Sequence, residues 1–156
     1  MTKKRNTSRN DPQEELCSAI KAIDLSKIEQ LLKAKIVPDL DSLLLAINQK
    51  AHEVLKDLIK AGADVNGWKG RIAYRVDTPV TRALIVRDNV ALKILLDAGA
   101  SPDKDCAAGP PLLYAAQKGL TESARLLIAA NADLEQSSNL ERLRSWSLRE
   151  WDTWRC

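Results

Sequence analysis

Hydrophobic residues recur along the chain at helical spacing, and short polar breaks interrupt them. The stretch from residue 78 to residue 103 shows the pattern, with apolar residues at Val80, Leu84, Leu92 and Leu95. Residues three or four apart share one face of an α-helix, so the first two positions define one face and the last two define another. The stretch therefore predicts two short amphipathic helices joined by a tight turn.

The same pattern occurs four times and is an internal repeat. The ends of the second predicted helices superimpose as "LLKAKIVPD", "LIKAGADVN", "LLDAGASPD" and "LIAANADLE", at residues 31–39, 58–66, 95–103 and 127–135. Counted back from these ends, the units begin at Glu14, Asp41, Thr78 and Pro110, so successive starts are 27, 37 and 32 residues apart. Such a period is typical of solenoids, in which each unit buries its apolar face against its neighbours.

The predicted helices begin and end at residues that favour helix termini for physical reasons. Thr78 precedes Pro79, so the hydroxyl can accept a hydrogen bond from a free backbone N–H and the proline suits the first helical position. Gly62 and Gly99 stop the second helices of their units in the left-handed conformation, where Asn131 is the next best residue. These signals place the turns between the helices.

The segment "TPVTRALIVRDNVALKILLDAGASPD" (78–103) resembles an ankyrin repeat, whose unit opens Thr-Pro-Leu-His and closes Leu-Leu-x-x-Gly-Ala-x-x-Asn. The segment 110–135 is similar, and the resemblance covers about residues 14 to 135. It implies an all-α solenoid of about four helix-turn-helix units with projecting loop or hairpin fingers. We number the units 1 to 4, at residues 14–40, 41–77, 78–109 and 110–136.

The chain departs from the family pattern at glycine positions. The family's mid-unit glycine is replaced by Ile23, Lys50 and Arg87 in the first three units, and Lys35 stands where unit 1 wants its closing glycine. A left-handed lysine costs roughly 1 kcal/mol. We therefore expect unit 1 to be a degraded N-terminal cap with a polar outer side.

The segments outside the repeats have their own composition. Residues 1–13 form a basic arm with Lys3, Lys4, Arg5 and Arg9, which we expect to be flexible. Residues 137–156 are rich in tryptophan, and the helical spacing of the apolar residues predicts a helix that caps unit 4. Two alternatives stay open for this segment: a helix that binds a partner or a membrane surface, and a segment with no fixed structure.

Composition narrows the class of protein. The 156 residues carry a formal net charge of +3, which the basic arm accounts for. No apolar run is long enough to span a bilayer. Three cysteines are odd in number and too few for a disulfide framework, so we expect an intracellular protein, cytoplasmic with a nuclear location open.

Nothing in the sequence assembles a catalytic or metal site. The one histidine, His52, falls at the start of a second helix, and no carboxylate is fixed beside it by sequence. The cysteines lie far apart without metal-ligand spacing. We therefore expect a protein that is not an enzyme and that has no cofactor, no metal and no small-molecule substrate.

The long connection between units 2 and 3 is the first candidate binding surface. Its residues 66–77, called the finger below, extend the usual spacing by about four residues. Aromatic residues and arginine often carry interface energy, and the finger offers these and lysine at Trp68, Lys69, Arg71, Tyr74 and Arg75. The alternative is that the rings fold back onto a neighbouring loop.

The second candidate surface is implied by the resemblance, because the eighth and ninth places of each ankyrin unit face the concave groove. Beside Lys21 and Ala22 of unit 1, these places form what we call the inner row: Asn48, Gln49, Ile85, Val86, Gln117 and Lys118. Polar residues here flank an apolar pair, as in many protein interfaces. The alternative is that the finger covers the apolar pair.

These features predict a non-catalytic protein–protein interaction module, an adaptor or a stoichiometric regulator. We expect a monomer that binds a partner protein of unknown identity through the finger and the concave helix face. Association with nucleic acid or the nuclear-import machinery through the basic arm is the less favoured alternative. The resemblance also implies Asn66 as a target of the asparagine hydroxylation that some ankyrin proteins undergo.

Overall fold

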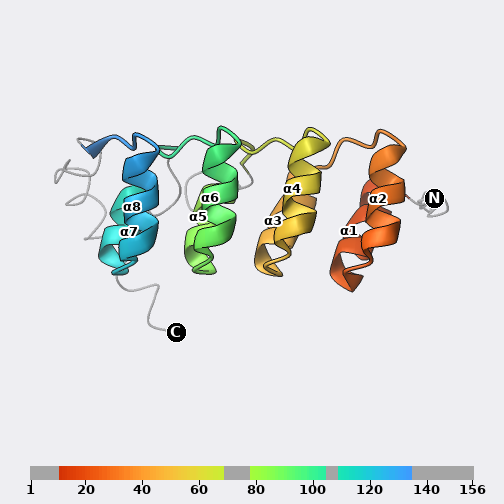
Figure 1. Ribbon diagram of the computed structural model, residues 1–156, viewed down its shortest axis with the longest axis horizontal. Coiled ribbons are helices and arrows are strands. Elements are labelled where there is room, and N and C mark those ends of the chain that lie inside the picture. The colour runs from red at the N-terminus through yellow and green to blue at the C-terminus, as the bar shows by residue number, and fades with distance from the viewer. Residues whose placement is uncertain (1–10, 69–77, 105–108, 135–156) are drawn as a thin grey trace, which may run out of the picture.

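The chain folds into a row of four helix pairs, as the computed structural model shows for residues 11–68, 78–104 and 109–134 (Figure 1). All eight helices of this described part belong to the row. Their bounds are α1 Pro12–Ala22, α2 Leu25–Lys33, α3 Leu40–Asn48, α4 His52–Lys60, α5 Pro79–Ile85, α6 Asn89–Asp97, α7 Pro111–Gln117 and α8 Thr121–Ala129. The predicted all-α solenoid is confirmed.

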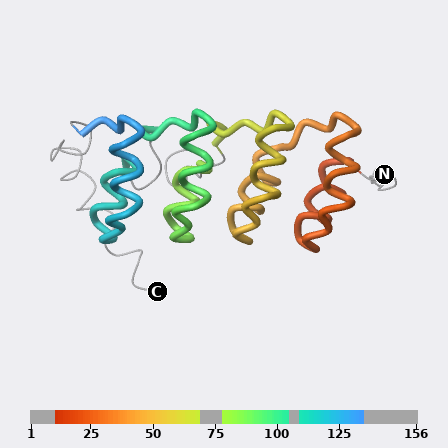
Figure 2. The backbone as a smooth tube through the Cα atoms, viewed as in Figure 1, coloured from red at the N-terminus to blue at the C-terminus, as the bar shows by residue number. Residues whose placement is uncertain are grey.

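The pairs stack in chain order. The first helices of the units, α1, α3, α5 and α7, pack one against the next, and the second helices, α2, α4, α6 and α8, do the same. The tube view shows the long connections along the upper edge of the row and the tight turns along the lower edge (Figure 2). Each unit therefore touches only its neighbours, as in other repeat proteins.

One continuous core runs through the row. The third place of every unit is buried, at Leu16, Leu43, Val80 and Leu112, each 7% exposed or less. The alanine at the sixth place of every unit is also buried, which lets the paired helices approach closely. The core positions predicted from helical spacing are therefore confirmed for most places.

The outer side of unit 4 is partly exposed. Leu127 and Ile128 are adjacent in α8, yet Ile128 is 49% exposed, whereas Leu127 is fully buried. In the described part of the chain, no further helix packs on this side of α8. The predicted Trp-rich cap at 137–156 lies outside the described residues, as do residues 1–10 of the arm, whereas Pro12 and Gln13, which were assigned to the arm, begin α1.

Left-handed residues close both turns of each unit. The second helices are followed by Lys35, Gly62, Gly99 and Asn131, with φ between 59° and 94°, as predicted. The mid-unit turns are also left-handed, at Ile23, Lys50, Arg87 and Gly119, with φ between 53° and 66°. Loss of the family glycine has therefore left the backbone unchanged, and the β-branched Ile23 holds a strained conformation.

Side-chain caps begin many of the helices. Thr78 caps α5 as predicted, since its Oγ1 accepts a hydrogen bond of 3.2 Å from the Thr81 N–H. Asp11, Asp24, Asp39 and Asp88 cap α1, α2, α3 and α6 in the same way, which the sequence reading did not identify. The signal was present, because aspartate is among the best N-cap residues.

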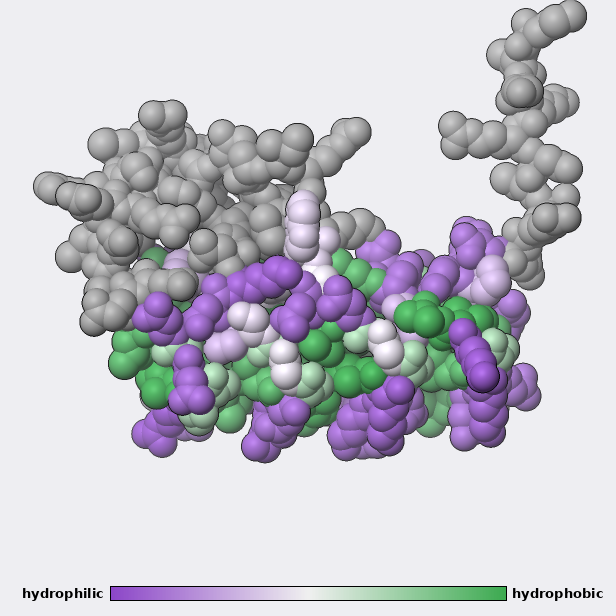
Figure 3. Space-filling view, turned by 90° about the horizontal axis from the view of Figure 1, so that it is seen from above, coloured by the Kyte–Doolittle hydropathy of each residue, from purple (hydrophilic) through white to green (hydrophobic). Residues whose placement is uncertain are grey.

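The surface of the row is uneven in polarity. Seen from the side that carries the long connections, hydrophilic residues line the lower edge of the view, and hydrophobic residues gather along the middle (Figure 3). Among the described residues, no helix is both long and apolar enough to cross a membrane. Because exposed hydrophobic patches often mark binding sites, the hydrophobic residues along this side are a candidate binding surface.

Candidate functional site

The two predicted binding surfaces lie at opposite ends of the units. The inner row stands where α3, α5 and α7 end, beside the tight turns, whereas the described base of the finger, residues 66–68, lies at the end with the long connections (Figure 1). One seven-residue helix separates the two ends, which is about 10 Å. A partner that contacts both surfaces must therefore extend along the inner helices.

The inner row is largely open to solvent. Asn48, Gln117 and Lys118 are exposed, and Ile85 at the centre is 48% exposed. The ammonium group of Lys118 lies 6.0 Å from the centroid of the Tyr114 ring. The row thus has an apolar centre with polar ends, as predicted.

Two members of the row are less free than expected. Val86 is half-buried and packs against the core. Gln49 is half-buried, and its Nε2 donates a hydrogen bond of 3.4 Å to the Lys21 carbonyl of unit 1. Ile85 is therefore the apolar residue that remains available at this surface.

Only the base of the finger, residues 66–68, belongs to the described residues. Trp68 is 57% exposed there. The other predicted contact residues of the finger, Lys69, Arg71, Tyr74 and Arg75, lie outside the described residues. Their part in partner binding stays a prediction.

Asn66 ties unit 2 to unit 3. Its Nδ2 donates 3.1 Å to the Gly99 carbonyl, and its Oδ1 accepts 2.7 Å from the Ser101 N–H. Its own carbonyl accepts a hydrogen bond from the Lys104 ammonium group. The side chain thus spans the junction and fixes where the finger begins, and its modification stays a prediction.

The same tie recurs one unit later. Asp103 stands at the same place in its unit as Asn66, and its Oδ1 accepts 2.8 Å from the Asp133 N–H. A second contact joins α6 to α8, where Ser123 Oγ donates 2.6 Å to Asn89 Oδ1. The first contact holds the long connections in register, and the second joins the starts of α6 and α8 beside the tight turns.

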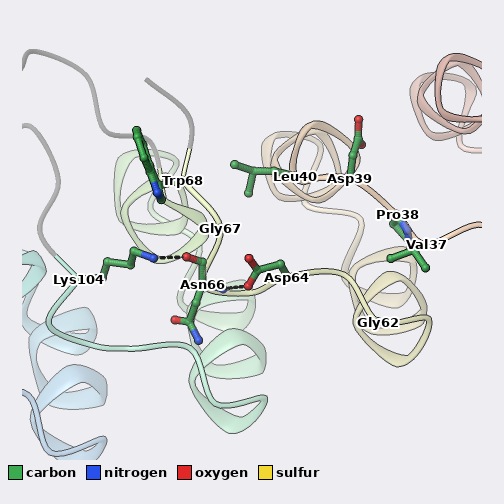
Figure 4. A pocket seen from close by; sticks show the side chains of 10 residues that line it. All are labelled: Val37, Pro38, Asp39, Leu40, Gly62, Asp64, Asn66, Gly67, Trp68 and Lys104. Carbon is green, nitrogen blue, oxygen red and sulfur yellow. Dashed lines mark hydrogen bonds between the residues drawn. The ribbon is translucent and has the colours of Figure 1, made fainter. Parts of the chain in front are cut away.

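A groove opens between the first two long connections, at the foot of the finger. It has a volume of about 500 Å³. Its lining combines the apolar side chains of Val37, Pro38, Leu40 and Trp68 with Asp39, Asp64, Asn66 and Lys104 and the glycines 62 and 67. Figure 4 shows Trp68 and Lys104 on one side, Val37 and Pro38 on the other, and Leu40 and Asp64 between them. The sequence reading found only Trp68 and Asn66 of this site, because the rest come from separate loops.

His52 has a carboxylate partner that the sequence reading missed. Its Nε2 lies 2.7 Å from Asp88 Oδ2, and the side chain of Asp88 is only 4% exposed. The two residues are 36 positions apart and meet because α4 packs against α6. This carboxylate is supplied by the stacking of units and is not fixed beside His52 by local sequence.

The surroundings of Asp88 account for its ionised state. Burial opposes ionisation, but hydrogen bonds from the Ala91 N–H, from His52 and from the Val90 N–H outweigh it and lower the pKa of Asp88. Both carboxylate oxygens are occupied, Oδ1 by the N-cap contacts and Oδ2 by His52. This arrangement joins units 2 and 3.

Within the three described ranges, no cluster of three or more histidine, cysteine, aspartate or glutamate side chains is placed to hold a metal ion. The one free cysteine described there, Cys17, is half-buried, and its Sγ lies 3.4 Å from Ser42 Oγ.

Comparison with known proteins agrees with the architecture. A family model described as ankyrin repeats (3 copies) matches residues 43–138. The crystal structure of EF0377, an ankyrin repeat protein, matches with a TM-score of 0.64 and 25% sequence identity. The match covers 78% of this chain but 63% of that one, so the chain spans under two thirds of its relative's length. A search of curated proteins finds no match.

The family model leaves unit 1 outside its range, because it begins at Leu43. The structure nevertheless places α1 and α2 on the row in the same way as the other pairs. Unit 1 also keeps both left-handed turns without any glycine. It is thus a fourth repeat whose sequence has diverged.

Proposed function

Because the chain belongs to the ankyrin-repeat family, whose repeats are generally protein–protein interaction modules, we propose that it is a non-catalytic adaptor or stoichiometric regulator. It binds a partner protein through the inner row and the finger, at the two ends of the inner helices. The small, odd number of cysteines supports a place in the cell interior. Ties between the units support a rigid surface, which lowers the ordering cost of binding.

The observation that supports this proposal most is the exposure of Ile85. This side chain is 48% exposed at the centre of the inner row, where Asn48 and Gln117 flank it with polar groups. An apolar centre with a polar rim is the usual layout of a protein interface. Val86 beside it supports the core, so Ile85 is the residue to test.

Affinity capture with the full chain tests the proposal. We expect Ile85→Ser to lose proteins that the wild type retrieves, because truncating a central apolar contact typically weakens binding by more than about tenfold. Trp68→Ala tests the finger in the same experiment. The captured proteins are identified and quantified by mass spectrometry.

Val90→Ser is the matched control. Val90 lies in the same unit and is 53% exposed, but it belongs to the second helix α6. A surface serine there should leave capture unchanged. If Ile85→Ser, Trp68→Ala and Val90→Ser all retrieve the same proteins equally, the proposed surfaces are wrong.

A further inference from the structure

The groove at the foot of the finger has exposed apolar walls. Val37 is 63% exposed on one side and Trp68 is 57% exposed on the other. Leu40 lies half-buried between them and points toward Trp68 (Figure 4). Two large apolar groups this exposed, in one groove of about 500 Å³, form a surface that a partner side chain can cover.

Gly67 shapes the floor of the groove. A Cβ atom added there would lie 3.2 Å from Leu40 Cδ1 and 3.2 Å from the Asp64 carbonyl oxygen. These distances are tight for a methyl group, so any other residue would displace Leu40. Glycine thus allows the two loops to approach and leaves the space above them open.

Two carboxylates at the groove are held in place with one oxygen free. Asp39 Oδ1 accepts 2.9 Å from the Ser42 N–H and 2.7 Å from the Ser42 hydroxyl. Asp64 Oδ1 accepts 2.9 Å from the Asn66 N–H. Within the described chain, the Oδ2 atoms make no hydrogen bond or ion pair. Each carboxylate can therefore accept a hydrogen bond without reorganisation.

The positive charge at the groove is already engaged. Among the described lining residues Lys104 is the one cation, and its ammonium group donates to the Asn66 carbonyl (Figure 4). The two aspartates and Lys104 give this described lining a net charge of −1. The groove thus offers apolar walls, a tryptophan and free acceptors.

Arginine is the side chain that fits these groups best. Its guanidinium group stacks on aromatic rings and carries five N–H donors, which suit carboxylate acceptors. It is also more weakly hydrated than a lysine ammonium, so its contact with apolar walls costs less. An acidic ligand would meet carboxylates of like charge, and a purely aliphatic ligand would make no hydrogen bond with them.

On this basis, and resting on the proposed function, we infer that the groove docks an arginine-bearing segment of the partner protein. The guanidinium group lies between the Trp68 ring and the carboxylate of Asp64, while the Asp39 carboxylate, which stands beyond Leu40, accepts a hydrogen bond from another part of the segment (Figure 4). An aliphatic side chain next to the arginine packs on Val37 and Leu40. Specificity for this segment comes from the pairing of charge and ring at one place.

Selection of short random peptides on the immobilised full chain tests this inference. We expect the selected peptides to share an arginine beside an aliphatic residue. A synthetic peptide of the selected sequence should bind Asp39→Asn/Asp64→Asn about tenfold more weakly, because a charge-assisted contact is lost. Asparagine keeps the Oδ1 acceptor and is as good an N-cap as aspartate, so the variant should stay folded.

The matched control removes the same charge elsewhere. Asp57 and Asp97 lie in α4 and α6, away from the groove, and pair with Lys60 and Lys93. We expect Asp57→Asn/Asp97→Asn to bind the peptide as the wild type does. Replacing arginine by glutamine in the peptide should weaken wild-type binding, yet have little effect on Asp39→Asn/Asp64→Asn, since the two changes remove one interaction.

Several results would overturn the inference. Selected peptides without arginine, equal binding to the wild type and Asp39→Asn/Asp64→Asn, or no selected peptide at all would each do so. Self-association that Asp39→Asn/Asp64→Asn abolishes would instead make a second copy of the chain the occupant. In all these cases, partner capture that depends on Ile85 would leave the proposed function standing.

Discussion

The junctions on the two sides of unit 2 join the same kind of helix pair by different means. Between units 1 and 2, the side-chain contacts described are Gln49 with the Lys21 carbonyl and Cys17 with Ser42, both at 3.4 Å. Between units 2 and 3, His52 and Asp88 meet at 2.7 Å, with Asp88 buried. Asn66 adds its contacts to Gly99 and Ser101 at the other end of the same junction.

The difference shows that one array can have short side-chain hydrogen bonds at a central junction and only long ones at the junction beside it. Helix stacking supplies the apolar core at both junctions. Short polar contacts appear at the second junction, beside which the groove and the described base of the finger lie. Because hydrogen bonds depend steeply on geometry, they fix register more strictly than apolar contact does. The proposed groove and the described base of the finger therefore lie beside a junction whose register is fixed by hydrogen bonds.

The largest expected effect comes from the core of unit 3. Leu95→Ala should lower the free energy of unfolding by about 3 kcal/mol, because Leu95 is fully buried and the change leaves a cavity. Leu31 stands at the same place in unit 1 but is only half-buried. Leu31→Ala should therefore cost about 1 kcal/mol. Urea denaturation measures both, and equal losses would contradict the contrast.

Asp88→Ala should cost about 2–3 kcal/mol, since it removes an N-cap and the buried partner of His52. Asp24 holds the same place in unit 1 and caps α2 through the Lys27 N–H, but it is exposed. Asp24→Ala should therefore cost about 1 kcal/mol. Adding His52→Ala to each variant gives a double-mutant cycle. A coupling energy near zero for His52 with Asp88 would show that the contact across the junction contributes nothing.

Asn66→Ala should cost about 1–2 kcal/mol, because two hydrogen bonds between units 2 and 3 are lost. Gln49→Ala removes the 3.4 Å contact between units 1 and 2 and should cost less than about 0.5 kcal/mol. Thermal unfolding of the two variants compares the junctions directly. A larger loss for Gln49→Ala would reverse the comparison.

Lys35→Gly should stabilise the chain by about 0.5–1 kcal/mol, because it relieves a left-handed lysine with φ of 59°. Gly99→Ala, at the corresponding place of unit 3 with φ of 84°, should destabilise it by about 1 kcal/mol. Hydrogen exchange of α2 and α6 locates each effect. No gain from Lys35→Gly would mean that unit 1 has absorbed the strain elsewhere.

The smallest expected difference is one of pH dependence. The lowered pKa of Asp88 means that its ionised form stabilises the fold fully above the ordinary aspartate pKa, near 4, and that this contribution is lost as pH falls further through the folded-state pKa. We expect the stability gap between wild type and Asp88→Asn to be constant near neutral pH and to narrow below about pH 4. Urea midpoints measured from neutral to acidic pH test this, and a gap that widens in acid would have the wrong sign.

Local signals in the sequence determined the repeat, the helix pairs and most of the core. Helical periodicity and turn chemistry act over three or four residues, so the roles of Leu92, Leu95 and Gly99 can be predicted from the residues near them in the chain. The left-handed turns at Ile23 and Lys50 follow from the phase of the repeat, although neither residue favours them. The phase of four units outweighs the preference of one residue.

Only the stacked structure decided which distant residues meet. The bond between His52 and Asp88, the tie from Asn66 to Ser101, and the groove between Val37 and Trp68 join residues about one repeat apart. Such contacts depend on the stacking register of adjacent units and on loop geometry, which local spacing does not specify. The stacking also decides that Leu127 is buried and the adjacent Ile128 exposed, because burial depends on what packs on each side of a helix.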